Sequence, residues 1–402
     1  MTIIVKCVCL VLVISFQTWN FTEAQAVNSR AFATATQLIS DAGYPVEKHR
    51  VHTEDGYILQ MHRIPAGRRS ARRTSQKGKK AVLIAHGLFG SSGDFVIMGP
   101  QRSLGYILAD AGFDVWIANF RGTMYSSHKT LPKSDAQFWD FSFHEHGKYD
   151  LPATIDKILS VTGLQKVMYI GYSMGSSSFF AMTDMRPEYN DKIVASINMA
   201  PGIYIEPSKD LFTFLLKTIK MPDLMRAQGV HYMNLPSNMR DILINTICTV
   251  KRDEDDLCMK VAQLFAGDDP EQIDKDVTPK ILARFQPASW KQLEHYGKLA
   301  ITGVFSSLDG GLDTPGKIYD LKKCRVPVVI IYGNNDRLTP KAESIRLAQE
   351  LNATGMLDEV TPVANWPKFN HLDFEFAKDV GNVLNKPLVR TIHNLFNKYD
   401  AL

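Results

Sequence analysis

The chain has 402 residues and a formal net charge of +4, from 46 Lys and Arg against 42 Asp and Glu. This near balance excludes a protein that binds nucleic acid or another polyanion through bulk charge. Hydrophobic residues make up 45% and charged residues 22%. This is an ordinary globular composition, which excludes disordered, collagen-like and coiled-coil chains, and the length suggests two or three structural units.

The first 26 residues are typical of a secretory signal peptide. Lys6 precedes the apolar run Cys7–Phe16, and the stretch ends in the small-x-small sequence Ala24-Gln25-Ala26. We expect cleavage before Val27 and a secreted or lysosomal protein. The alternative, an N-terminal membrane anchor, is disfavoured because no apolar run approaches the roughly 20 residues that span a bilayer.

Three cysteines remain after that cleavage, in a compartment that favours disulfides. Cys248 and Cys258 are close in sequence, so we expect them to pair and to leave Cys324 free. Asn352-Ala353-Thr354 is a glycosylation sequon that fits the secretory route.

The first recognisable elements form a hairpin and a series of buried strands. Glu54-Asp55-Gly56 separates two strand-like runs, 46–52 and 57–62, which predicts a β-hairpin. The basic stretch 68–80 has no apolar periodicity and is predicted to be a solvated loop, with an anionic contact or a processing site as the alternative. Short β-branched apolar runs follow at 81–85, 114–118, 166–170 and 193–199, and the strand rhythm resumes at 326–332 and 358–363. Such runs are typical of a parallel sheet covered by helices on both faces.

The strand rhythm stops between about 201 and 317, where the pattern is helical. Apolar residues share one helical face in 211–219 and in 239–247, and Ser289 with Gln292 predicts a capping box. On sequence alone, these apolar stripes are more typical of a simple core than of a lipid contact. We predict an α/β fold with an inserted helical cap: signal peptide 1–26, core 27–200, cap 201–317, and core again over 318–402, ending in a helix at 388–399.

A nucleophile elbow is predicted at the end of the run 166–170. The following residues 171–175 read Gly-Tyr-Ser-Met-Gly, the G-x-S-x-G pattern, in a strand–turn–helix context. The pattern alone is weak because glycine and serine are common. Its context makes Ser173 the candidate nucleophile.

A serine nucleophile needs a histidine base and a carboxylate that orients the histidine. In α/β hydrolases these follow the serine in the order acid, then histidine. Asp336 follows the buried run 326–332, and His371 follows the next strand. Both therefore lie at carboxyl ends of strands, where sites in open α/β sheets form.

The oxyanion hole needs two backbone N–H groups. We predict that Met174, the residue after the nucleophile, supplies one and that Leu88, in the loop after strand 81–85, supplies the other. His86 in the same loop is predicted to be a hydrogen-bonded structural histidine.

These residues resemble the acid lipases of the gastric and lysosomal type, including insect lipase-3-like members. The resemblance runs from about Val46 to Leu395 and rests on 53–59 (Thr-Glu-Asp-Gly-Tyr-Ile-Leu), 86–88 (His-Gly-Leu), 119–122 with 125–126, 138–143 with 147–153, and 369–374 (Phe-Asn-His-Leu-Asp-Phe). It implies an α/β-hydrolase fold, hydrolysis of triacylglycerols and cholesteryl esters, and a site at Ser173, Asp336 and His371 with oxyanion donors Leu88 and Met174.

The chain departs from that family inside the elbow. The family usually has His and Gln on either side of the nucleophile, whereas this chain has Tyr172 and Met174. A backbone donor at 174 is compatible with methionine, but the local polarity differs. The cap is the least similar region, so chain-length preference does not carry over.

One other pattern in the chain contains possible metal ligands. His144-Glu145-His146 has side chains that suit a metal, but two histidines at i and i+2 diverge on a helix and no third ligand is evident. We therefore expect no metal and no other cofactor, since there is also no nucleotide fingerprint.

The sequence thus predicts a lipase that acts on lipid esters at a lipid–water interface through a Ser-His-Asp acyl-enzyme. Two alternatives remain, a general carboxylesterase of the same fold and a non-catalytic lipid-binding or storage protein. We expect no nucleic-acid partner, no transmembrane span, and a monomer or weak oligomer.

Overall fold

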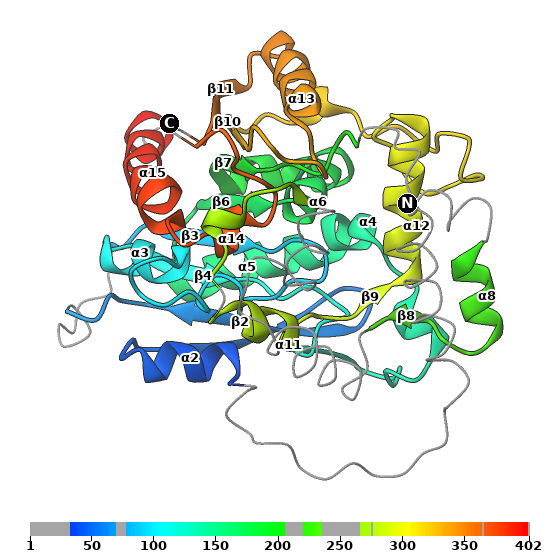
Figure 1. The fold of residues 1–402 in the computed structure, drawn as a ribbon, viewed down its shortest axis with the longest axis horizontal. Helices are drawn as coiled ribbons and strands as arrows, with labels where there is room; N and C mark the ends of the chain where they lie inside the picture. Colours follow the sequence, from blue (N-terminus) through cyan, green and yellow to red (C-terminus); the bar gives the residue numbers. More distant parts are fainter. Residues whose placement is uncertain are drawn as a thin grey trace. The chain divides into compact units, whose positions relative to one another are not determined.

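The computed structural model describes residues 33–69, 78–205, 220–234, 266–274, 276–363 and 366–400. In the unit that begins at Ala33, the centre is a nine-stranded sheet with the order β1-β2-β4-β3-β6-β7-β10-β11, and β5 pairs with β2 (Figure 1). The strands are β1 (Glu47–His52), β2 (Tyr57–Ile64), β3 (Ala81–Ala85), β4 (Asp114–Ile117), β5 (Ser126–His128), β6 (Val167–Tyr172), β7 (Ile193–Met199), β10 (Val328–Tyr332) and β11 (Leu357–Pro362).

The sheet is parallel from β4 to β11 and antiparallel at β1, β2 and β5. The predicted hairpin and the predicted mostly parallel sheet are therefore confirmed. Strands β3 and β7 have the predicted bounds, the other predicted strands differ by one or two residues, and β5 was not predicted. The run predicted from Val326 begins as β10 only at Val328, because Pro327 has no N–H to donate to a neighbouring strand.

Helices cover both faces of the sheet and bury two separate cores. Successive residues of β3 alternate between them: Leu83 packs in one core, while Val82 and Ile84 pack in the other. One face carries α4 (Phe143–Glu145), α5 (Leu151–Thr162), α6 (Met174–Met185) and α13 (Lys341–Ala353); the other carries α2 (Ala35–Asp41), α3 (Leu104–Asp110), α14 (Asp373–Phe376) and α15 (Lys386–Tyr399). The all-apolar strands follow from burial on both faces.

The described parts of the segment between β7 and β10 are mostly helical. They include α8 (Met221–Ala227), α11 (Thr278–Ala283) and α12 (Trp290–Thr302), with a short pairing of β8 (Tyr232–Met233) and β9 (Ala288–Ser289). The predicted capping box is confirmed, since the Gln292 N–H donates to Ser289 Oγ and the Ser289 N–H donates to the Gln292 side chain. The boundaries of the cap at 201 and 317 stay a prediction.

Several predictions lie outside the described residues: the signal peptide 1–26, most of the basic loop, the helical faces within 211–219 and 239–247, and the cysteines Cys248 and Cys258. Cys324 is buried with a free thiol. Across the described ranges, every helix is too short or too polar to cross a bilayer.

Candidate functional site

Ser173 lies at a sharp turn between β6 and α6, as the elbow pattern predicts. Its backbone has φ 51° and ψ −110°, a strained conformation for a residue with a side chain. The turn presses against β3, because a Cβ on Gly175 would stand 2.5 Å from the Ala85 carbonyl oxygen. Glycine at this position lets the elbow approach the central strands.

The structure brings Ser173, His371 and Asp336 together in one chain of hydrogen bonds. His371 Nε2 is 2.9 Å from Ser173 Oγ, and His371 Nδ1 is 2.7 Å from Asp336 Oδ2. An ionised carboxylate can only accept, so the Nδ1–H donates to Asp336 and Nε2 is free to accept the serine proton. Asp336 and His371 are each 5% exposed, so these contacts lie mostly out of water.

The carboxylate of Asp336 is held by its own loop. Oδ1 accepts the N–H groups of Leu338 and Thr339 at 2.9 and 2.8 Å, and Oδ2 accepts the Thr339 hydroxyl at 2.8 Å. Thr339 was not among the residues predicted from the sequence. The Asx-turn pattern, in which an aspartate bonds the N–H groups two and three residues on, was the signal that could have found it.

A short segment from the inserted region also bridges the two loops. The Ala266 carbonyl oxygen accepts the N–H groups of both Arg337 and His371, each at 3.3 Å, and the Asn370 amide donates to the Gly267 carbonyl at 3.0 Å. These contacts are made by the backbone of residues with no distinctive side chain, so no sequence pattern pointed to them.

The two predicted oxyanion donors flank Ser173. Met174 is the first residue of α6, where backbone N–H groups have no partner within the helix. Leu88 follows Gly87, and a Cβ on Gly87 would stand 3.3 Å from Ser173 Cβ, which places this loop beside the serine. The assignment of these N–H groups as donors to an oxyanion stays a prediction.

His86 shapes the loop that carries Leu88. Its Nε2 accepts the Phe120 N–H at 3.1 Å, so the proton is on Nδ1, which donates to the Gly87 carbonyl at 2.8 Å. Burial lowers the pKa of His86 to about 4. A neutral ring with both nitrogens occupied is the structural histidine expected from the sequence.

Tyr172 and Met174, the residues on either side of Ser173, both have hydrogen-bond partners. The Tyr172 hydroxyl donates to the His371 carbonyl at 2.8 Å. The Gln292 amide of α12 donates to Met174 Sδ at 3.3 Å. Both residues are buried, at 3% and 2% exposure.

The side chains of His144, Glu145 and His146 each have a different partner. His144 Nδ1 is 2.7 Å from the Tyr319 hydroxyl, Glu145 caps the start of α4, and the His146 ring stacks on Phe120 at 4.4 Å. Among the described residues, no group of three His, Cys, Asp or Glu side chains could hold a metal ion.

Asn352 lies exposed near the end of α13. Its glycosylation stays a prediction.

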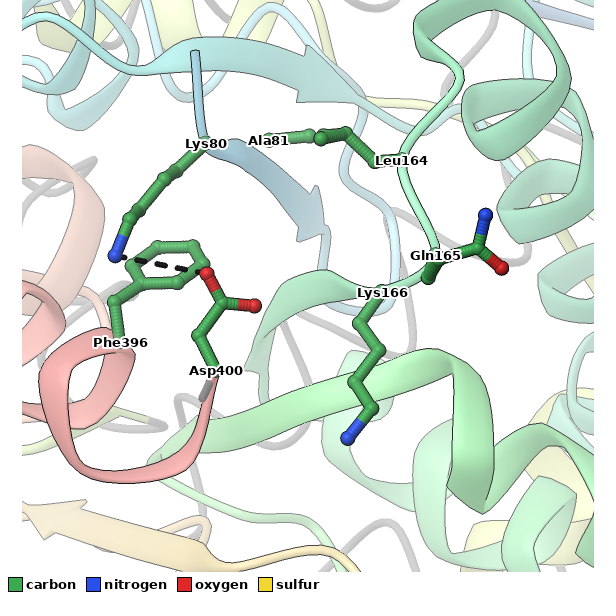
Figure 2. Close-up of a pocket in the computed structure, with 7 residues that line it drawn as sticks. All are labelled: Lys80, Ala81, Leu164, Gln165, Lys166, Phe396 and Asp400. Atoms are coloured by element: carbon green, nitrogen blue, oxygen red, sulfur yellow. Dashed lines mark ion pairs between the residues drawn. The ribbon is translucent and has the colours of Figure 1, made fainter. Parts of the chain in front are cut away.

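A separate hollow opens at the amino ends of β3 and β6, where Lys80 pairs with Asp400 at 3.6 Å beside Phe396 (Figure 2). Since Ser173 follows the carboxyl end of β6, this hollow lies at the opposite end of the strands from the candidate site.

Comparison with known proteins assigns the chain to a family. Residues 80–362 match the family model described as the alpha/beta hydrolase fold, and residues 35–99 match that of a partial alpha/beta-hydrolase lipase region. Lipase 3 of Drosophila melanogaster is 36% identical over 86% of this chain and 89% of its own length. The chain belongs to the α/β-hydrolase lipase family.

Other members of this lipase family are similarly close. Lipase 1 of Drosophila melanogaster is 34% identical over 89% of this chain and 79% of its own length. Gastric triacylglycerol lipase of Bos taurus is 32% identical over 88% of this chain and 89% of its own length. Among solved structures, a candidate lipase from Sulfolobus solfataricus aligns with a TM-score of 0.58 over 87% of this chain and 94% of its own, at 16% identity. This last likeness supports the fold alone. The family predicted from the motifs is confirmed.

Proposed function

We propose that this lipase-family protein hydrolyses carboxylic esters of lipids, with Ser173 as nucleophile, His371 as general base and acid, and Asp336 as the group that orients the histidine. The observation that carries the proposal is the hydrogen-bond chain from Ser173 Oγ through His371 to Asp336, at 2.9 and 2.7 Å, at a strained elbow.

The chemistry follows from this geometry. Ser173 Oγ attacks the ester carbonyl carbon while its proton passes to His371 Nε2, and Asp336 stabilises the imidazolium. The carbonyl oxygen becomes an oxyanion, which the Leu88 and Met174 N–H groups would stabilise by about 3 kcal/mol each. The alcohol leaves with the proton from His371, and water then attacks the acyl-enzyme and releases a fatty acid.

An apolar cluster supports a lipid substrate. It lies beside the loop of residues 86–103 between β3 and α3, which carries Leu88 and is called the oxyanion loop below. Met225 of α8 packs with Trp290 and Leu293 of α12, and Leu88 and Phe89 of the oxyanion loop lie against them. An acyl chain that extends from the reacting carbonyl past Leu88 would contact this cluster. We infer triacylglycerols, steryl esters or both as substrates, the first in line with the name of the bovine gastric relative.

The finer features of the expected protein are part of the same proposal. We infer a signal peptide over 1–26 and a secreted or lysosomal location, a disulfide between Cys248 and Cys258, and glycosylation at Asn352. The expected action at a lipid–water interface and the expected monomer or weak oligomer belong here as well.

The test is hydrolysis of emulsified long-chain triacylglycerol and of a soluble short-chain ester by the mature protein and by Ser173→Ala. We expect long-chain turnover that falls at least about 10⁴-fold in the variant, as when other serine hydrolases lose the nucleophile. A matched control is Ser103→Ala, a buried serine at the start of α3 on the other face of the sheet, which should keep full activity.

The alternatives give different results. Turnover of the short-chain ester alone would favour a general carboxylesterase. Bound lipid without turnover of either substrate would favour a lipid-binding or storage protein.

A further inference from the structure

Tyr172 connects the candidate nucleophile to the loop of the candidate base. It directly precedes Ser173 at the end of β6, and its hydroxyl donates to the main-chain carbonyl oxygen of His371 at 2.8 Å. Its ring also lies beside the His371 imidazole, with the ring centroids 5.2 Å apart. The side chain therefore fixes both the backbone and the ring of His371.

The same ring supports the oxyanion loop from the other side. A Cβ on Gly87 would stand 2.9 Å from Cε1 of Tyr172, so the backbone before Leu88 rests on the phenol ring. The ring also faces Phe374 of α14, with centroids 6.1 Å apart. One buried side chain thus belongs to the elbow and contacts both the oxyanion loop and the loop that carries His371.

The Tyr172 hydroxyl is a hydrogen-bond donor at both acidic and neutral pH. Burial raises the pKa of its phenol well above the ordinary value of 10, and the carboxyl groups of Glu375, Asp336, Asp94 and Asp373 add to the shift. The hydroxyl therefore stays protonated at acidic and neutral pH and keeps its hydrogen bond to His371. A histidine at this position would change its charge within that range.

We propose that Tyr172 is a positioning residue for catalysis. Its side chain holds the loop that carries His371 in a fixed position relative to Ser173 and to the oxyanion loop. The proposal rests on the function proposed above. A tyrosine that only filled the core would affect folding stability and leave the kinetics of the folded enzyme unchanged.

The first test is Tyr172→Phe, which removes the hydroxyl and keeps the ring. With a soluble ester, we expect kcat to fall about fivefold at unchanged KM, the size expected for one lost neutral hydrogen bond. The rate at which a fluorophosphonate labels Ser173 should fall in parallel, because it also depends on His371. The matched control is Tyr106→Phe, another buried tyrosine whose hydroxyl donates to a main-chain carbonyl, that of Leu38, outside the site.

The second test is Tyr172→His, followed as kcat against pH. The groups that would face this histidine are Glu375 and Asp373 from α14, Asp94 from the oxyanion loop, Asp336 and His371. A positioning role predicts an ionisation in the kcat profile that the wild type lacks. A purely structural role predicts a kcat profile of unchanged shape.

The outcomes separate this inference from the proposed function. Wild-type kcat and labelling rate in Tyr172→Phe, or an unchanged profile shape in Tyr172→His, would overturn the positioning role. If Tyr172→Phe fails to fold, the profile of Tyr172→His decides. If Ser173→Ala keeps its activity, the proposed function itself fails, whatever the Tyr172 variants do.

Discussion

At the scale of single residues, the orientation of Asp336 depends on a hydroxyl next to it. Thr339 Oγ1 donates to Asp336 Oδ2 at 2.8 Å, the same oxygen that accepts from His371. Hydrogen bonds to a charged acceptor contribute about 1.5 to 3 kcal/mol, more than neutral ones. The hydroxyl therefore restrains the carboxylate that in turn orients the imidazole.

We predict that Thr339→Val, which keeps the shape and removes the donor, lowers kcat about tenfold at nearly unchanged KM. The measurement is the steady-state kinetics of a soluble ester. Thr302→Val is the control, because the Thr302 hydroxyl donates to the Lys298 carbonyl and accepts the Val304 N–H at the end of α12, and neither partner belongs to the candidate site. Equal kcat values in wild type and Thr339→Val would show that the backbone N–H groups suffice to hold Asp336.

The three candidate catalytic residues could be predicted from the sequence, whereas the contacts that hold them could not. Ser173 and Asp336 follow the buried strands β6 and β10, and His371 follows the next strand, β11. This is the chain order of α/β hydrolases, so the sequence could single these residues out. The contacts of Tyr172 with His371 and of Ala266 with two loops join residues far apart in the chain. They depend on how loops fold over the sheet, which apolar periodicity does not encode.

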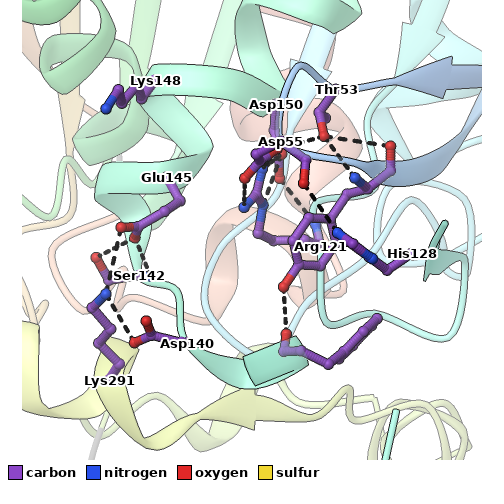
Figure 3. A network of polar contacts seen from close by, with 12 residues as sticks. Thr53, Asp55, Arg121, His128, Asp140, Ser142, Glu145, Lys148, Asp150 and Lys291 are labelled. Carbon is purple, nitrogen blue, oxygen red and sulfur yellow. Dashed lines mark hydrogen bonds and ion pairs between the residues drawn. The ribbon is translucent and has the colours of Figure 1, made fainter. Parts of the chain in front are cut away.

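At the scale of elements, buried charges fasten three segments together. Arg121, in the loop after β4, pairs with Asp55 in the β1–β2 turn at 2.6 Å and with Asp150, the last residue of the π-helix 146–150, at 2.7 Å (Figure 3). The guanidinium also lies 4.0 Å from the ring centroid of Tyr57. The Arg121 and Asp150 side chains are 1% and 0% exposed, so neither charge is solvated when its partner is lost.

We predict that Arg121→Met lowers the free energy of unfolding by about 3 to 5 kcal/mol, because the Asp150 carboxylate is left buried without its partner. Denaturant unfolding measures the change. Arg186→Met is the control, since its partners Glu54 and Glu188 are exposed and remain solvated without it, so each pair should be worth below about 1 kcal/mol. Similar losses in both variants would contradict the special weight of the buried network.

A second set of contacts ties α12 of the inserted segment to the hydrolase core. Lys291 pairs with Asp140 at 3.0 Å, His295 Nδ1 lies 2.9 Å from Ser142 Oγ, and the Tyr296 hydroxyl lies 2.9 Å from Ser177 Oγ (Figure 3 for Lys291). The start of α12 could be predicted from the sequence, because Ser289 and Gln292 form a capping box there. Its attachment could not be predicted, because each partner lies more than 100 residues away in the chain.

At the scale of the whole molecule, buried carboxyl groups gather around the site. Asp94 lies in the oxyanion loop, while Asp373 and Glu375 lie in α14, and all three are at most 7% exposed. Burial raises the pKa of Asp94 to about 7 and that of Asp373 to about 8, and it raises the pKa of Glu375 well above the usual range. These groups are neutral in the folded protein under acidic conditions.

This arrangement links stability to pH with a definite sign. Unfolded, these carboxyls ionise near pH 4, whereas Asp373 folded holds its proton to about pH 8. The folded state therefore binds more protons between these values, and stability falls as pH rises from about 4 to 8. Buried His86, with its pKa lowered to about 4, acts oppositely, because its unfolded form gains a proton below about pH 6.5.

A single substitution isolates the carboxyl contribution from that of the histidines. Asp373 Oδ2 accepts the Asn370 N–H at 2.7 Å, and the amide oxygen in Asp373→Asn can keep this bond without titrating. We predict that the thermal midpoint of the wild type, relative to Asp373→Asn, falls steadily from pH 4 to pH 8. Calorimetry at unit pH steps measures the difference, with exposed Asp191→Asn as the control. A difference that stays constant over this range would mean that Asp373 ionises normally in the folded protein, and a difference that grows with pH would reverse the sign of the linkage.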